Sequence, residues 1–209
     1  MVKGILLFHG FGKIMKKNEY KMELFDIFKQ FAVKINLNED LKKLINFSFK
    51  IEKEQKGRFL SNQGGFQSTD LNKKEPCLES LIKKIELNSN LLFNDYLKIK
   101  CKLSLDNIWI NINRYKDFNI QHVHPFSKLS GVFYIKTPSN SGNLTFVNDF
   151  PVENFIDLSG ITERNTYNSS LWTFEPEENT LYLFPSWLKH YVNPNLSKQE
   201  RISISFNLR

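Results

Sequence analysis

The chain has 209 residues, of which 41% are hydrophobic and 14% aromatic, so it can build one domain with its own core. Its formal charge of +7 permits contact with nucleic acid, but the lysines are scattered and no nucleic-acid motif is found. Cys77 and Cys101 resemble neither a disulfide framework nor a metal knuckle, and no signal peptide or membrane span is recognised. These features exclude a disulfide-rich secreted scaffold and an integral membrane protein, and they predict a cytoplasmic protein without membrane contact.

The N-terminal half is helical and basic in character. Residues 1–30 are expected to form a loosely ordered extension, since Met15 offers an alternative start. After an extended stretch near 31–37, we expect Asn38 to cap a helix and a second helix to begin at about Cys77. Apolar residues recur at helical spacing in both segments: Leu41, Leu44, Ile45 and Phe49, then Leu78, Leu81, Ile82 and Ile85.

Between these helices, Ser61 to Asp70 is rich in turn-forming residues and contains the pair Gly64 and Gly65. This composition predicts a surface loop. Because glycines flanked by amides and aromatics also suit a loop that covers a ligand, a substrate loop is the alternative.

From about residue 98 the hydrophobic period changes to two, which predicts strands. In Ile108 to Arg114 the isoleucines take one face while Trp109, Asn111 and Asn113 take the other, so this strand is expected to line a cavity. Further strands are expected at Ser130 to Thr137 and Asn143 to Asn148, joined as a hairpin by 138–142, then at Thr180 to Phe184 and Arg201 to Leu208. Two helices followed by many short strands predict an α+β fold, either a small antiparallel barrel or a jelly roll, with the N-terminal helices packed on one sheet.

Three of the four histidines form one candidate metal site. His122 and His124 are two residues apart, so both side chains can project to one face of a strand while Val123 points away. His190 follows a strand and a proline-led turn, and it is expected to face back across the barrel. Because neutral imidazole is the commonest metal ligand, the three could hold one ion. The alternative is a polar pair beside a turn and a separate, hydrogen-bonded structural histidine.

The last strand has one polar and one apolar face. Its polar residues alternate with Ile202, Ile204 and Phe206, and they are Arg201, Ser203, Ser205 and Asn207. An outer strand facing solvent would show the same alternation. A polar face headed by arginine also suits an interior that holds a charged ligand, because the guanidinium fork matches a carboxylate and a serine two residues on adds a hydroxyl.

The spacing of these residues resembles the iron(II) and 2-oxoglutarate-dependent oxygenases, whose common pattern is HxD or HxE, a distal histidine and RxS. The resemblance is greatest to a group from marine bacteria and their phages, and it is carried by Asn111 to Asn113, His122 to Pro125, Ser130 to Ile135, Leu183 to Leu188 with His190, Arg201 to Asn207, and an N-terminal signature at Ser61 to Ser68. It implies a single oxygenase domain over residues 1–209, with a helical support at 31–100 and a double-stranded β-helix, or jelly-roll, core at 101–209.

The resemblance also implies the cofactor and the reaction. Fe(II) would be the metal, 2-oxoglutarate and O2 the cosubstrates, and an unidentified substrate would be hydroxylated with release of succinate and CO2. The implied metal ligands are His122, His124 and His190, and the implied 2-oxoglutarate contacts are Arg201, Ser203, Tyr134 and Asn113. No catalytic residue is expected beyond the metal ligands.

His124 stands where most members of the superfamily carry a carboxylate. We expect three histidine ligands, because alternation along a strand delivers both imidazoles; the alternative is that Asp149 replaces His122 or His124. Two other functions stay open: a three-histidine dioxygenase of the cupin type that needs no 2-oxoglutarate, and a non-catalytic jelly-roll protein that binds nucleic acid or carbohydrate. Arg201 and Ser203 favour the oxygenase over the cupin type, which offers them no specific role.

Overall fold

The computed structural model describes residues 13–17, 20–25, 27–150, 152–154 and 156–209. The chain separates into two units, Met1–Phe31 and Ala32–Arg209. In the first unit, β1 (Lys13–Lys17) pairs antiparallel with β2 (Tyr20–Leu24). Of the extension expected over 1–30, residues 1–12 lie outside the described part of the chain.

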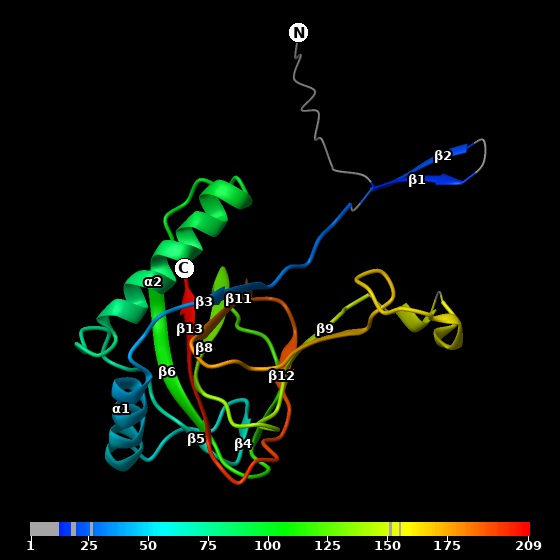
Figure 1. The fold of residues 1–209 in the computed structure, drawn as a ribbon. Helices are drawn as coiled ribbons and strands as arrows, with labels where there is room; N and C mark the ends of the chain where they lie inside the picture. The colour runs from blue at the N-terminus through cyan, green and yellow to red at the C-terminus, as the bar shows by residue number, and fades with distance from the viewer. Residues whose placement is uncertain (1–12, 18–19, 26, 151, 155) are drawn as a thin grey trace. The chain divides into compact units, whose positions relative to one another are not determined.

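Two antiparallel sheets make up the unit Ala32–Arg209 (Figure 1). The six-stranded sheet has the order β3 (Val33–Asn36), β11 (Thr180–Pro185), β8 (Leu129–Lys136), β13 (Arg201–Leu208), β6 (Leu105–Asn113) and β5 (Phe66–Gln67). The five-stranded sheet has the order β10 (Leu171–Phe174), β9 (Leu144–Val147), β12 (His190–Val192), β7 (Phe118–His122) and β4 (Asn62–Gln63). This arrangement is a double-stranded β-helix, as the sequence predicts.

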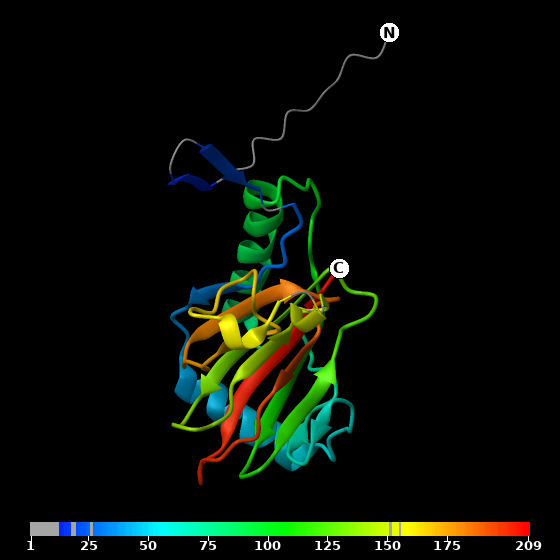
Figure 2. The same cartoon turned by 90° about the vertical axis from the view of Figure 1, so that its right-hand side faces the viewer.

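Both predicted helices, α1 (Leu41–Glu54) and α2 (Glu79–Leu91), cover the six-stranded sheet on the side away from the other sheet (Figure 2). The N-cap of α1 is Asp40 and not Asn38, because the Asp40 side chain accepts from the backbone N–H of Lys43. The described part of the chain also contains a short π-helix at Leu92–Tyr96 and 3₁₀ turns at Val152–Asn154 and Leu158–Gly160. No helix in the described ranges is long and apolar enough to cross a membrane.

The alternation in β6 and β13 separates the hydrophobic core from a pocket. On the face toward the helices, Ile108, Ile110 and Ile112 are fully buried, and so are the apolar residues of β13. On the opposite face, polar residues of both strands line a pocket between the sheets: Asn111, Asn113, Arg201, Ser203 and Ser205. The polar side of β13 therefore faces the barrel interior, and the alternative of a strand facing solvent is wrong.

The predicted hairpin around 138–142 is wrong. β8 belongs to the six-stranded sheet and β9 to the five-stranded sheet, so this turn carries the chain from one sheet to the other. Turn-forming residues mark the reversal, but they do not specify which strand becomes the neighbour.

The segment Ser61 to Asp70 is more than a surface loop. β4 pairs with β7 and β5 with β6, so the segment joins one edge of each sheet. Gly64 and Gly65 make the turn with φ of +69° and +65°, and a Cβ on Gly64 would overlap the Asp117 carboxylate. The glycine pair is thus required by a tight turn that closes one side of the barrel.

Candidate metal centre

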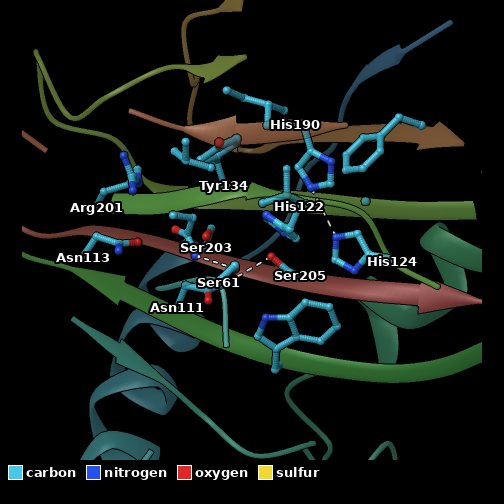
Figure 3. A pocket seen from close by; sticks show the side chains of 17 residues that line it. Ser61, Asn111, Asn113, His122, His124, Tyr134, His190, Arg201, Ser203 and Ser205 are labelled. Carbon is cyan, nitrogen blue, oxygen red and sulfur yellow. Dashed lines mark hydrogen bonds between the residues drawn. The ribbon is translucent and has the colours of Figure 1, made fainter. Parts of the chain in front are cut away.

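The pocket between the sheets has a volume of about 490 Å³, including solvent at its open mouth (Figure 3). The histidines lie toward one end and Arg201 toward the other, with a polar strip between them (Figure 3). The side chains of this strip are Ser61, Asn111, Asn113, Ser203 and Ser205.

The structure brings the three predicted histidines together. His122 ends β7 and lies directly opposite His190 at the start of β12, with ring centroids 4.4 Å apart. The Nε2 atoms of His124 and His190 are 3.2 Å apart. Each ring offers one ligand nitrogen, and these atoms all lie within 4.8 Å of one another. Such a set can hold one metal ion.

Backbone carbonyls orient two of the rings. The Nδ1 of His122 lies 2.7 Å from the oxygen of Ile120, and the Nδ1 of His190 lies 2.9 Å from the oxygen of Leu188. Because a carbonyl only accepts, each ring must donate its Nδ1–H, which leaves Nε2 with a free lone pair. This second contact is typical of metal-binding histidines, where it fixes both the tautomer and the ring orientation.

Burial keeps the cluster neutral. Loss of solvent lowers the pKa of His122 and takes that of His190 well below its ordinary value, 6.5. Burial and, second, the charge of His122 lower the pKa of His124 to about 3. All three imidazoles are therefore in the metal-binding form at neutral pH, and such nitrogen donors suit iron.

A β-bulge aims His122 into the pocket. His190 of β12 pairs with His122 of β7, and Val192 of β12 pairs with Asn119 of β7. One residue separates the two positions on β12 and two residues separate them on β7, so β7 carries one extra residue. Ile120 is turned outward and is 44% exposed, whereas Asn119 faces the pocket. Strict alternation would place Ile120 beside His122, and for this reason the sequence did not predict Asn119.

Asn119 and Ser61 are pocket residues that the sequence analysis did not predict as site residues, although Ser61 begins the N-terminal signature. Asn119 donates from Nδ2 to the Oγ of Ser61 at 3.1 Å, and the backbone of Ser61 accepts from Ile120. Ser61 comes from the segment that closes the barrel. Asn119 and Gln121 alternate regularly with Phe118 and Ile120, so the local pattern of β7 gives no signal that Asn119 faces the pocket.

Arg201 is a buried cation with unused hydrogen-bonding capacity. It is 1% exposed, and its Nη1 donates to the carbonyl oxygens of Ser141, Gly142 and Asn193. Its Nη2 is buried and has no partner among the described residues. Burial lowers the pKa of Arg201, although Tyr134 and Asp117 oppose the shift. None of the described residues that line the pocket is an aspartate or glutamate, so an acidic ligand is the partner that this arginine fits.

The other predicted 2-oxoglutarate contacts surround Arg201 on the same inner face. Asn113 is its register partner on β6, and Ser203 is paired with Tyr134 on β8. All of them line the pocket. Tyr134 is buried, and this burial raises the pKa of its hydroxyl to about 12 although Arg201 opposes the shift. Its phenol is therefore a hydrogen-bond donor at neutral pH.

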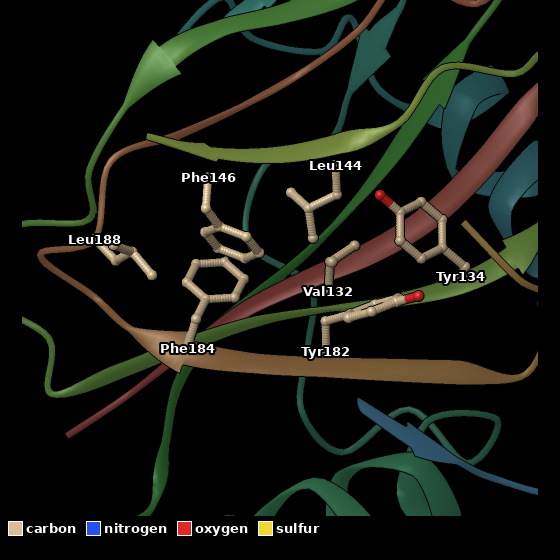
Figure 4. Close-up of a cluster of buried hydrophobic side chains, with 7 residues drawn as sticks. All are labelled: Val132, Tyr134, Leu144, Phe146, Tyr182, Phe184 and Leu188. Atoms are coloured by element: carbon tan, nitrogen blue, oxygen red, sulfur yellow. The ribbon is translucent and has the colours of Figure 1, made fainter. Parts of the chain in front are cut away.

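A cluster of buried, mostly apolar side chains (Figure 4) packs against His190 through Phe146 and Phe184. The cluster consists of Val132, Tyr134, Leu144, Phe146, Tyr182, Phe184 and Leu188. Phe184 packs against His190 with ring centroids 4.6 Å apart, and it also packs edge-on against Phe146. These rings keep water away from one side of the site and hold His190 in place.

The alternative ligand Asp149 lies in a different setting. Its carboxylate pairs with the ammonium of Lys189 at 2.7 Å, and both side chains are 46% exposed. The metal-ligating cluster found in the described part of the chain consists of the three histidines. The geometry therefore favours the three-histidine set over a set with Asp149.

Residues 107–207 match the model of a family described as "Putative 2OG-Fe(II) oxygenase". This match confirms the resemblance to the 2OG-Fe(II) oxygenases. The resemblance to a group from marine bacteria and their phages stays a prediction. No curated protein matches the chain.

Solved structures share the fold. A prolyl-4-hydroxylase from Pseudomonas putida is 13% identical with a TM-score of 0.61, and the match covers 86% of this chain and 92% of that one. A viral collagen prolyl hydroxylase from Paramecium Bursaria Chlorella virus-1, in complex with 2OG, is 15% identical with a TM-score of 0.56, and the match covers 86% of this chain and 96% of that one. HygX from Streptomyces hygroscopicus, with nickel and 2-oxoglutarate bound, is 12% identical with a TM-score of 0.59, and the match covers 86% of this chain and 82% of that one.

Proposed function

We propose that this chain is a 2OG-Fe(II) oxygenase, the family whose model residues 107–207 match, and that His122, His124 and His190 hold its iron(II). The three imidazoles are neutral, and their ligand atoms lie within 4.8 Å of one another. Bound iron(II), together with 2-oxoglutarate and O2, supplies the oxidising power that hydroxylates a substrate and leaves succinate and CO2.

The observation that carries the proposal is Arg201. A buried guanidinium, whose Nη2 has no partner among the described residues, lies in the same pocket as the histidine cluster, and the described lining of this pocket contains no aspartate or glutamate. Burying an unpaired cation is costly, and an acidic ligand offsets that cost. We assign Arg201 to the distal carboxylate of 2-oxoglutarate.

Three neighbours complete the proposed cosubstrate site. Ser203 and the Tyr134 hydroxyl can donate to the same carboxylate, since both lie in the row of side chains next to Arg201. Asn113 lies opposite Arg201 and can hold the cosubstrate from the other side. Phe184 and its neighbours exclude water from the wall of the site. Binding, orientation and exclusion of water are thus the roles of the protein, and we assign no separate acid or base.

Turnover of 2-oxoglutarate tests the proposal directly. Purified protein with iron(II) is expected to consume O2 and release succinate, and both should stop when a chelator removes the metal. If the iron-loaded protein neither binds nor turns over 2-oxoglutarate, the proposed function is wrong. Oxygen uptake on a small substrate without 2-oxoglutarate would favour a cupin-type dioxygenase.

We also propose that the protein works in the cytoplasm. Cys77 and Cys101 are free thiols, which suits a reducing compartment. Fractionation of cells that express the chain, with detection by antibody, tests the location.

A further inference from the structure

A chain of hydrogen-bonded polar side chains, all buried except the half-buried Asn107, crosses the inner face of the six-stranded sheet. Ser186 and Ser130 have their Oγ atoms 2.8 Å apart, and Ser130 donates to the Oδ1 of Asn207 at 2.7 Å. Asn207 in turn donates from Nδ2 to the Oδ1 of Asn107 at 2.9 Å. We call these four residues the Ser-Asn chain. It links β8, β13 and β6 to the turn that follows β11.

The direction of the Ser-Asn chain is fixed by its protons. A hydroxyl has one proton, and that of Ser130 goes to Asn207, so Ser186 must be the donor to Ser130. Ser130 is 0% exposed and Ser186 1% exposed. Apolar residues would fill these positions without the cost of burying hydroxyls. None of the four is among the described residues that line the pocket, so contact with a ligand does not account for them.

The end of the Ser-Asn chain bears on His124. β7 ends at His122, so strand pairing does not position His124. Instead, the backbone N–H of His124 donates to the carbonyl oxygen of Ser186 at 2.8 Å. The rings of His122 and His190 are also held through Nδ1, whereas we find no such contact for His124 in the described part of the chain. His124 therefore depends on its backbone anchor more than the other two histidines do.

We propose that the Ser-Asn chain is the positioning device for His124. The side-chain hydrogen bond from Ser186 to Ser130 fixes the turn, the turn presents its carbonyl oxygen, and that oxygen sets where the third imidazole lies. This inference rests on the proposed iron site and goes beyond it by assigning a role to Ser130, Ser186 and Asn207. Metal sites tolerate displacements of only a few tenths of an ångström, so a small movement of the turn affects metal binding more than folding.

The test replaces Ser130 by alanine and uses Co(II) alone as the probe. Metal-free wild type and the Ser130→Ala variant are titrated with Co(II) by calorimetry, and visible absorption reports the ligand set. We expect Co(II) to bind about tenfold more weakly, as is typical when a group that orients a ligand is removed. The absorption of the variant should move toward that of His124→Ala.

Ser48→Ala is the matched control. Ser48 is also fully buried and donates one hydrogen bond, to the oxygen of Leu44 at 2.8 Å, but it lies in α1. We expect this variant to bind Co(II) like the wild type. Thermal unfolding of the metal-free proteins shows whether the two alanine variants lose similar stability.

Ser186→Ala is the second variant, for the case that Ser130→Ala does not fold. It removes the hydroxyl that donates to Ser130 and keeps the backbone carbonyl that accepts from the N–H of His124. If Ser130→Ala or Ser186→Ala folds and retains wild-type affinity and absorption, the role of the Ser-Asn chain is refuted while the iron site stands. If wild type itself binds Co(II) no better than His190→Ala, the iron site and the inference fail together.

Discussion

Replacing Arg201 by methionine should abolish tight binding of 2-oxoglutarate. Methionine keeps most of the side-chain volume but removes the guanidinium, which is 1% exposed and has one buried nitrogen without a partner among the described residues. Truncating one side of a buried, hydrogen-bonded charge pair costs about 2–5 kcal/mol. We therefore expect the Kd of 2-oxoglutarate to rise by about 30-fold to about 5,000-fold.

The assay is calorimetric titration of 2-oxoglutarate into protein loaded with nickel, which prevents turnover. Arg114→Met is the matched control, because Arg114 pairs with Glu52 at 2.8 Å and its side chain is 49% exposed. Such surface pairs contribute less than about 1 kcal/mol, and this one lies outside the pocket lining. If Arg201→Met binds 2-oxoglutarate within about threefold of wild type, the assignment of Arg201 to its carboxylate is refuted.

Three further predictions concern the same barrel. Tyr134→Phe removes one neutral hydrogen bond and should weaken 2-oxoglutarate binding about twofold to tenfold in the same titration, whereas an unchanged Kd would exclude contact through the hydroxyl. The metal-free protein should lose stability as the pH falls below 6.5, because His124 then takes up a proton in the unfolded state but, with a pKa of about 3, stays neutral in the folded state. Urea unfolding midpoints at pH 7 and pH 5 measure this loss, and equal midpoints would contradict the prediction. Gly131→Ala places a Cβ 2.4 Å from the Phe206 ring and 2.5 Å from the carbonyl oxygen of Tyr182, so urea unfolding should show a loss of about 1–3 kcal/mol, and an unchanged midpoint would show that the strands yield without cost.

Much of the barrel could be predicted because alternation is a local property of a strand. The isoleucines of β6 lie against the helices, and the polar residues of β13 face the interior, as their spacing predicts. Histidine and arginine are also few enough, and chemically specific enough, for their spacing to carry meaning. The candidate ligands His122, His124 and His190, with Arg201, accordingly meet in one pocket.

Long-range pairing decided what local patterns leave open. The turn at 138–142 joins two sheets, and Ser61 to Asp70 closes the barrel edge, because the partner of a strand is chosen by the packing of the whole sheet. The bulge in β7 exposes Asn119 to the pocket, although alternation would favour Ile120. The sequence by itself determined which side chains can serve as ligands. Only the tertiary structure decided how His124 is held, since its backbone anchor, Ser186, lies 62 residues further along the chain.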